Sequence, residues 1–91
     1  MQTQITPYFQ KRLRELPKPM RVTIIEKIEQ CDAAASLRDI PHLKDLKGHK
    51  KHRYYRIRVG NYRLGFEIIE QVLVFQTLGV RGDFYKEYPP K

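Results

Sequence analysis

The first third of the chain repeats its hydrophobic residues at intervals of three and four, the spacing of one helix face. Pro17 and Pro19 divide this pattern, because proline is excluded from a helix interior but suits the first turn of a new helix. Two helices forming an αα-hairpin are therefore predicted. Residues 2–6 alternate weakly and are compatible with an edge strand before the first helix. The hydrophobic residues of the helical pattern are Phe9, Leu13, Leu16, Met20, Ile24, Ile25 and Ile28.

From residue 54 onward the pattern changes to alternating β-branched and aromatic residues, which is typical of strands. The preceding residues 36–52 are predicted to form a loop, because Pro41 and Gly48 oppose regular structure. Helices followed by antiparallel strands predict an α+β fold. We expect an N-terminal helical hairpin packed on a curved antiparallel β-sheet of about four strands. The strands predicted here are residues 54–59, 62–69 and 72–78, separated by the turns Gly60-Asn61 and Glu70-Gln71.

A two-residue turn at Gly60-Asn61 would fix the pairing of the first two strands, with Arg58 opposite Arg63 and Arg56 opposite Gly65. Because side chains alternate faces, the apolar residues then point toward the helices and the arginines toward the other side. Directly opposed like charges destabilise a sheet by about 0.2–1 kcal/mol per pair. A bound polyanion would offset this cost, and Gly65 is expected to leave room for it to approach.

A fourth arginine is expected to join this face. If the third strand continues its pairing without interruption, Leu78 lies opposite Arg63 and Arg81 follows just beyond the strand. Guanidinium groups match phosphate oxygens in pairs, and aromatic rings stack on unpaired bases. We therefore predict an RNA-binding surface. The aromatic residues expected to stack on bases are Tyr54, Phe84, Tyr85 and Tyr88.

Composition points in the same direction. The length of 91 residues suits a single domain, and a net charge of +8 with a pI near 9.8 indicates an anionic partner. No apolar run reaches the roughly 18 residues of a membrane span, and the first residues lack the basic and apolar blocks of a secretory signal. A cytoplasmic protein without membrane attachment is expected. The predicted RNA-binding residues of the basic loop are Lys44, Lys47, Lys50, Lys51, His52 and Arg53.

Other chemistry receives less support from the sequence. Cys31 is the only cysteine, so an intramolecular disulfide is impossible; a packed helix residue is expected, with a catalytic thiol as the alternative. His42, His49 and His52 lack the spacing of a zinc site, and no metal or other cofactor is expected. His52 precedes the arginine strand and is the histidine best suited to proton transfer, since free imidazole titrates at about pH 6.5.

Four segments together resemble the RelE/ParE superfamily of bacterial type II toxin-antitoxin toxins, and more specifically its RelE-like mRNA endonucleases. The segment "LKG" followed by "YRIRVGNYR" is the specific signature, whereas the helices alone would be weak. The resemblance implies one RelE-like toxin domain over residues 1–91, with a basic cleft on its central sheet. In the family's order, the segments are "FQKRLRELPKPMRVTIIEKIEQ", "LKDLKG", "YRIRVGNYRLGFEI" and "LGVRGDFY".

The resemblance also implies a set of catalytic positions. Two departures concern proton transfer: Val80 stands where relatives often have His or Lys, and Arg56 where lysine is common. Arginine stays protonated and cannot readily act as a general base, so Lys47, His52 and Tyr85 are the candidates for that role. The residues that match the family's catalytic positions are Arg56, Arg58, Arg63, Arg81 and Tyr85.

As a function, the resemblance implies a metal-independent endoribonuclease, or mRNA interferase, that cleaves mRNA on the ribosome and inhibits translation. The implied reaction is attack of the RNA 2′-hydroxyl on the adjacent phosphate. The implied partners are a cognate acidic antitoxin, the ribosome and mRNA, with operator DNA contacted only through the antitoxin complex. Two alternatives stay open: a ParE-like DNA gyrase inhibitor without RNase activity, and a catalytically silent module that binds nucleic acid or antitoxin.

Overall fold

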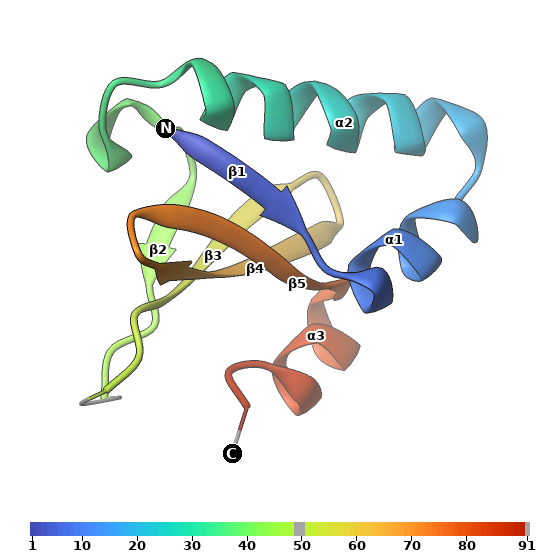
Figure 1. Ribbon diagram of the computed structural model, residues 1–91. Coiled ribbons are helices and arrows are strands. Elements are labelled where there is room, and N and C mark those ends of the chain that lie inside the picture. The colour runs from blue at the N-terminus through green and yellow to red at the C-terminus, as the bar shows by residue number, and fades with distance from the viewer. Residues whose placement is uncertain (49–50, 91) are drawn as a thin grey trace.

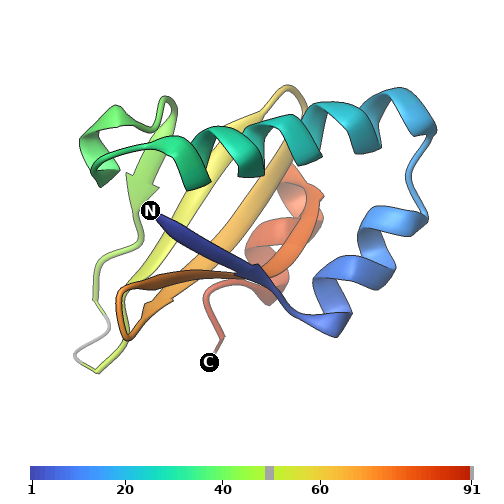
Figure 2. The same ribbon diagram turned by 45° about the horizontal axis from the view of Figure 1, so that its top comes forward.

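The computed structural model describes residues 1–48 and 51–90, and these residues form a five-stranded sheet with helices on both faces (Figures 1 and 2). The strand order is β1-β5-β4-β3-β2, with β1 parallel to β5 and the other pairs antiparallel. No helix in this part of the chain is long and apolar enough to cross a membrane. The elements are β1 (Gln2–Ile5), α1 (Pro7–Arg14), α2 (Lys18–Ala33), the 3₁₀ helix η1 (Leu37–Asp39), β2 (Leu43–Asp45), β3 (Tyr54–Val59), β4 (Tyr62–Ile69), β5 (Val72–Val80) and α3 (Arg81–Glu87).

The first two helices begin and end where the prolines require. Thr6 caps α1 by accepting a hydrogen bond from the Phe9 amide at 3.2 Å, and Pro7 occupies the first turn. Pro17 precedes α2, and Pro19 lies in its first turn, where a missing amide hydrogen costs nothing. The predicted division of the helical pattern at Pro17–Pro19 is therefore confirmed.

The larger hydrophobic core lies between the sheet and the helices α1 and α2. Phe9 of α1 packs edge-on against Phe75 of β5 with ring centroids 5.7 Å apart, and Phe75 packs on Phe66 at 5.2 Å. All three rings are fully buried. The prediction that one set of β3 and β4 side chains faces the helices is confirmed, because its members all belong to this core. They are Tyr55, Ile57, Val59, Tyr62, Leu64, Phe66 and Ile68.

A second, smaller core lies on the opposite face of the sheet, under α3. It consists of Tyr54, Phe84 and Tyr88, with Leu46 packed against them. The Tyr88 ring meets Tyr54 edge-on at 5.4 Å, and both Phe84 and Tyr88 lie directly over Gly65. Gly65 does leave space, as predicted, but this chain fills that space with its own rings. The expectation that Gly65 admits a nucleotide is therefore wrong.

The fold class is α+β as predicted, but three details of the prediction are corrected. The sheet has five strands and is mixed, because β1 precedes the helices and pairs parallel to β5. Strand β2 lies inside the predicted loop, where its three residues are too few to produce an alternating pattern. The C-terminal segment forms α3, which Gly82 and the terminal prolines obscured in the sequence.

The strand register is confirmed on one side of β4 and corrected on the other. Between β3 and β4, Arg58 pairs with Arg63 and Arg56 with Gly65, as predicted. Between β4 and β5, Phe66 pairs with Phe75 but Gly65 pairs with Thr77, so Gln76 is an extra residue in β5. This bulge moves the register by one residue. Arg63 consequently lies opposite Gly79, and the prediction that it faces Leu78 is wrong.

We expect Gly65→Ala to destabilise the protein by about 1–3 kcal/mol, the usual cost of overpacking a core. A Cβ at this position would lie 2.7 Å from ring atoms of Tyr88 and 3.1 Å from Phe84, so α3 must shift outward. Urea unfolding followed by circular dichroism measures the change. Gly82→Ala is the matched control: a Cβ there meets nothing within 4 Å, and alanine favours the helix. Equal stability of Gly65→Ala and wild type would contradict the packing described.

Candidate nucleic-acid interface

Arginine side chains from β3 and β4 share the sheet face on which α3 lies, and we call this surface the arginine face. Its members are Arg56, Arg58 and Arg63, in the predicted cross-strand arrangement. Lys44 of β2 pairs with Arg56 and therefore joins the same face. Arg81, the first residue of α3, follows two residues after Gly79, the partner of Arg63. The bulge in β5 thus places Arg81 at the end of the arginine face, next to Arg63.

Hydrogen bonds hold two of the arginines in place. Arg56 donates through Nε to the Tyr85 hydroxyl at 3.1 Å and through Nη1 to the His42 carbonyl at 3.1 Å. Arg58 donates through Nη2 to Nδ1 of His42 at 3.2 Å. Tyr85 comes from α3 and His42 from the turn before β2, so segments distant in sequence meet at Arg56 and Arg58.

No carboxylate of the described residues forms an ion pair with a guanidinium group of this face. In the described ranges 1–48 and 51–90, the ion pairs are Arg12–Glu87 at 3.3 Å and His52–Glu67 at 2.6 Å. Arg63 instead donates to the backbone carbonyls of Gly60 and Tyr62 at 3.2 Å each. The positive charge of the arginine face therefore stays available to an external anion. The paired N–H groups of a guanidinium ion suit phosphate oxygens.

Arg81 is exposed, and within the described residues it has no hydrogen-bond or ion-pair partner. It precedes the exposed residues Gly82 and Asp83 at the start of α3. Its side chain is thus free to take the position that a bound anion requires. Val80, the residue in place of the His or Lys of many relatives, is also exposed and offers an apolar side chain beside it.

The predicted RNA-binding residues do not all lie on the arginine face. Lys44 does; Lys47 and Lys51 are exposed on the connection from β2 to β3, and Lys50 lies outside the described residues. Arg53 turns toward the other side of the sheet, where it donates to the Tyr55 hydroxyl at 2.7 Å.

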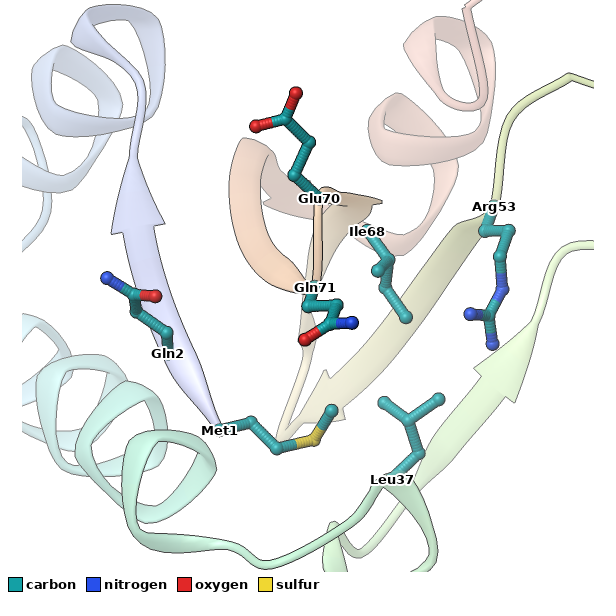
Figure 3. Close-up of a pocket in the computed structure, with 7 residues that line it drawn as sticks. All are labelled: Met1, Gln2, Leu37, Arg53, Ile68, Glu70 and Gln71. Atoms are coloured by element: carbon teal, nitrogen blue, oxygen red, sulfur yellow. The ribbon is translucent and has the colours of Figure 1, made fainter.

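Arg53 also lines a pocket of about 500 Å³ beside η1 and the turn from β4 to β5 (Figure 3). Ile68, whose side chain belongs to the larger core, lines the same pocket. The pocket therefore opens on the helix side and is separate from the arginine face. Its full lining is Met1, Gln2, Leu37, Arg53, Ile68, Glu70 and Gln71.

Three of the four aromatic residues predicted to stack on bases are buried instead. Phe84 is 0%, Tyr88 2% and Tyr54 6% exposed, because they form the core under α3. Burial raises the pKa of the Tyr88 phenol well above its usual range, so this group stays a hydrogen-bond donor. Tyr85, at 43% exposed, is the aromatic residue of this set that offers a ring to solvent.

A buried polar chain under α3 was not predicted from the sequence. Glu67 accepts from Gln76 Nε2 at 2.9 Å and pairs with His52 Nδ1 at 2.6 Å, while Tyr88 donates to Gln76 Oε1 at 2.7 Å. Gln76 is the bulge residue, and Glu67 is a carboxylate between the apolar residues Phe66 and Ile68 of β4, which is the signal that the sequence offered. The chain ties α3 to the sheet.

This polar chain also explains the position of His52. Its ring stacks on Tyr54 at 5.4 Å, beside Glu67 and beyond the Tyr88 ring that covers Gly65. Along β3, Tyr54 lies two residues from Arg56 and four from Arg58, about 7 and 13 Å at the usual rise of a strand, and within the described residues His52 makes no hydrogen bond to either arginine. The structure therefore does not bring His52 together with the arginines. Among the described histidines, His42 is the one with hydrogen bonds to the arginines, and sequence reasoning missed it as a site residue.

Cys31 carries no site chemistry in this arrangement. Its side chain is fully buried in the larger core, and burial raises the pKa of the thiol from its usual 9.0 to about 11. The expectation of a packed helix residue is confirmed, and the alternative of a catalytic thiol is not supported. Among the described residues, no cluster of three or more His, Cys, Asp or Glu side chains suited to a metal ion occurs.

Residues 3–83 match the family described as ParE toxin of type II toxin-antitoxin system, parDE. Toxin RelE3 of Methanocaldococcus jannaschii is 39% identical over 82 residues, which cover 89% of this chain and 91% of that protein. The RelB-RelE antitoxin-toxin complex from Methanococcus jannaschii has a similar structure, with a TM-score of 0.75, 34% identity, and coverage of 94% of this chain and 99% of that one. The archaeal RelE-RelB complex from Pyrococcus horikoshii gives a TM-score of 0.73 at 24% identity, with 91% and 97% covered.

The small α+β fold with a cationic sheet face under a C-terminal helix is thus the fold of RelE-like toxins. The chain belongs to the RelE/ParE superfamily and is a toxin of a type II toxin-antitoxin system.

We expect the Cys31 thiol to be unreactive toward a thiol-specific disulfide reagent at pH 8 and to react fully in urea, because the native side chain is buried.

The raised pKa of Cys31 also predicts that the stability of the protein depends on pH. The contribution of the buried thiol to stability is fully present below pH 9. It is lost as pH rises from 9 toward about 11, because in this range the thiol ionises in the unfolded chain but not in the folded protein. Cys31→Ala is the control and should lack this part of the alkaline decline in urea midpoint.

Proposed function

We propose that this toxin is a ribosome-dependent endoribonuclease that cleaves mRNA and so inhibits translation. One observation carries the proposal. Arg56, Arg58 and Arg63 share one face of the sheet, and α3 begins beside this face with Arg81. No described carboxylate pairs with any of these four arginines. Such a surface suits a phosphodiester backbone better than a neutral substrate. The relationship of this protein to RelE-like toxins points to mRNA as the substrate.

The proposed reaction is attack of the RNA 2′-hydroxyl on the adjacent phosphorus, without a metal ion or other cofactor. Arg63 and Arg81 would clamp the phosphate and stabilise the charge that develops on its oxygens. Hydrogen bonds to Tyr85 and His42 hold Arg56 and Arg58 on this face before RNA binds, and both guanidinium groups would exchange these partners for the RNA strand that they orient. Tyr85, half-exposed beside Arg56, would stack on a base.

We further propose that the chain works as one RelE-like domain in the cytoplasm, held inactive by a cognate acidic antitoxin. Two features support an antitoxin: the net charge of +8, and the fact that the similar solved structures are antitoxin-toxin complexes. An acidic segment lying over the arginine face would neutralise it. Operator DNA would then be contacted only through the complex.

A second function has one observation in its favour, since the matching family is described by its ParE toxins. A ParE-like protein would inhibit DNA gyrase and need no RNase chemistry. The cationic residues retained on the arginine face favour RNA cleavage over this alternative. A catalytically silent module that binds nucleic acid or antitoxin is the third possibility, and the apolar Val80 favours it.

We expect Arg81→Ala to lower ribosome-dependent mRNA cleavage by at least about 10²-fold, the usual loss when one charge-stabilising group is removed. Arg81 is exposed and its side chain has no hydrogen-bond or ion-pair partner within the described residues, so the urea midpoint should not change. Arg38→Ala, which removes an exposed arginine of η1, is the matched control and should cleave like wild type. Full activity of Arg81→Ala would remove the proposed site.

A gyrase supercoiling assay run beside the cleavage assay separates the two main functions. Inhibition of supercoiling without cleavage on ribosomes would identify the ParE-like activity instead.

Binding of single-stranded RNA should weaken with salt, with a slope of log affinity against log salt near −2 for about three phosphate contacts. Arg58→Gln should reduce the slope by about 0.7, because one fewer counterion is released. Fluorescence anisotropy with a labelled oligonucleotide measures both values, with Arg38→Ala as the control. A response that does not change with salt would argue for a protein partner of the arginine face.

A further inference from the structure

His42 occupies an unusual position at the edge of the arginine face. It follows Pro41 in the turn before β2, its side chain is exposed, and its backbone has φ +62°, a left-handed conformation. This conformation turns its carbonyl and its ring toward β3. The carbonyl accepts from the Arg58 amide at 3.2 Å and from Arg56 Nη1 at 3.1 Å, while the ring Nδ1 lies 3.2 Å from Arg58 Nη2.

The hydrogen bond to Arg58 defines the tautomer of this ring. A guanidinium group can only donate, so Nδ1 must be the acceptor and the ring proton must sit on Nε2. His42 therefore presents an unprotonated nitrogen beside Arg58, one of the two groups proposed to orient the RNA strand. If Arg58 turns toward a phosphate, the lone pair of Nδ1 is released at the same place.

The other side chains near this position are less suited to accepting a proton. Arg56, Arg58 and Lys44 face the same side of the sheet, and Tyr85 reaches it from α3. Arginine, lysine and tyrosine carry a proton at neutral pH and must lose it before they can act as a base. His52 is held by Glu67 under α3, and Lys47 lies on the exposed connection after β2.

We infer that His42 is the general base of the proposed cleavage, an inference that rests on the proposed function. Nδ1 takes the proton of the RNA 2′-hydroxyl as the bond from O2′ to phosphorus forms and the bond from phosphorus to O5′ breaks. The leaving O5′ takes a proton from water, and the imidazolium ion returns its own proton to solvent. The products are a 2′,3′-cyclic phosphate and a 5′-hydroxyl.

The test compares wild type with His42→Asn in single-turnover cleavage of mRNA on programmed ribosomes, across a range of pH. Asparagine tolerates the left-handed conformation and can still accept from Arg58, but it cannot take up a proton. We expect the cleavage rate to fall by about 10²–10⁴-fold, the usual range for a general base. The toxin concentration giving half-maximal rate should stay near that of wild type. The acidic decline of the wild-type rate should be absent in the variant.

A second variant separates proton transfer from positioning. Glycine adopts φ +62° without strain, so His42→Gly should fold, and added imidazole should restore part of its rate if only the base is missing. A slow His42→Asn that keeps the wild-type pH profile, with no imidazole rescue of His42→Gly, would assign His42 a positioning role and overturn the inference. Wild-type activity in His42→Asn would also overturn the inference. A wild-type toxin that does not cleave on ribosomes would instead end the proposed function, and this inference with it.

Discussion

The packing of α3 across the sheet is the interaction on which the cationic surface depends. Two rings of the C-terminal segment, Phe84 and Tyr88, rest on Gly65, a position of the central strand β4 without a side chain. This packing places Tyr85 beside Arg56, and it places Arg81, the first residue of α3, next to the arginine face. The polar chain through Gln76 and Glu67 adds direction to this contact, since hydrogen bonds require a specific geometry that apolar packing does not. A helix docked even one turn differently would separate the exposed tyrosine from the arginines.

The like charges on the sheet are tolerated because other terms are larger. Opposing Arg58 and Arg63 costs about 0.2–1 kcal/mol, whereas burial of one phenylalanine contributes about 1.5–3 kcal/mol. Phe9, Phe66 and Phe75 are all fully buried behind that face. The guanidinium groups also donate hydrogen bonds to His42, Tyr85 and backbone carbonyls. The residues that the structure describes therefore present a cationic surface with no paired carboxylate, and an anion that binds there gains attraction without having to assemble the site.

The sequence predicted the parts of the structure that depend on local pattern. The turn at Gly60-Asn61 fixed the register of β3 and β4, and with it the shared face of three arginines. It did not predict the bulge at Gln76, because an extra residue in a strand leaves the alternation of its neighbours almost unchanged. It also missed the burial of Tyr88 and the hydrogen bonds of His42 to Arg56 and Arg58, since both depend on which distant segment supplies the partner. Pairing between segments far apart in sequence is the information that periodicity lacks.

The pairing of β1 with β5 sets the order in which the protein can be completed during its own synthesis. Strand β1 lies near the amino end of the chain, its partner follows about seventy residues later, and α3 comes after that partner. A nascent chain whose β5 and α3 are still enclosed in the exit tunnel has no partner for β1 and no Tyr85 beside Arg56. In a chain that folds as it emerges, the hairpin of β3 and β4 with its three arginines can therefore form while β1 is still unpaired, and the contact of Tyr85 with Arg56 is made last.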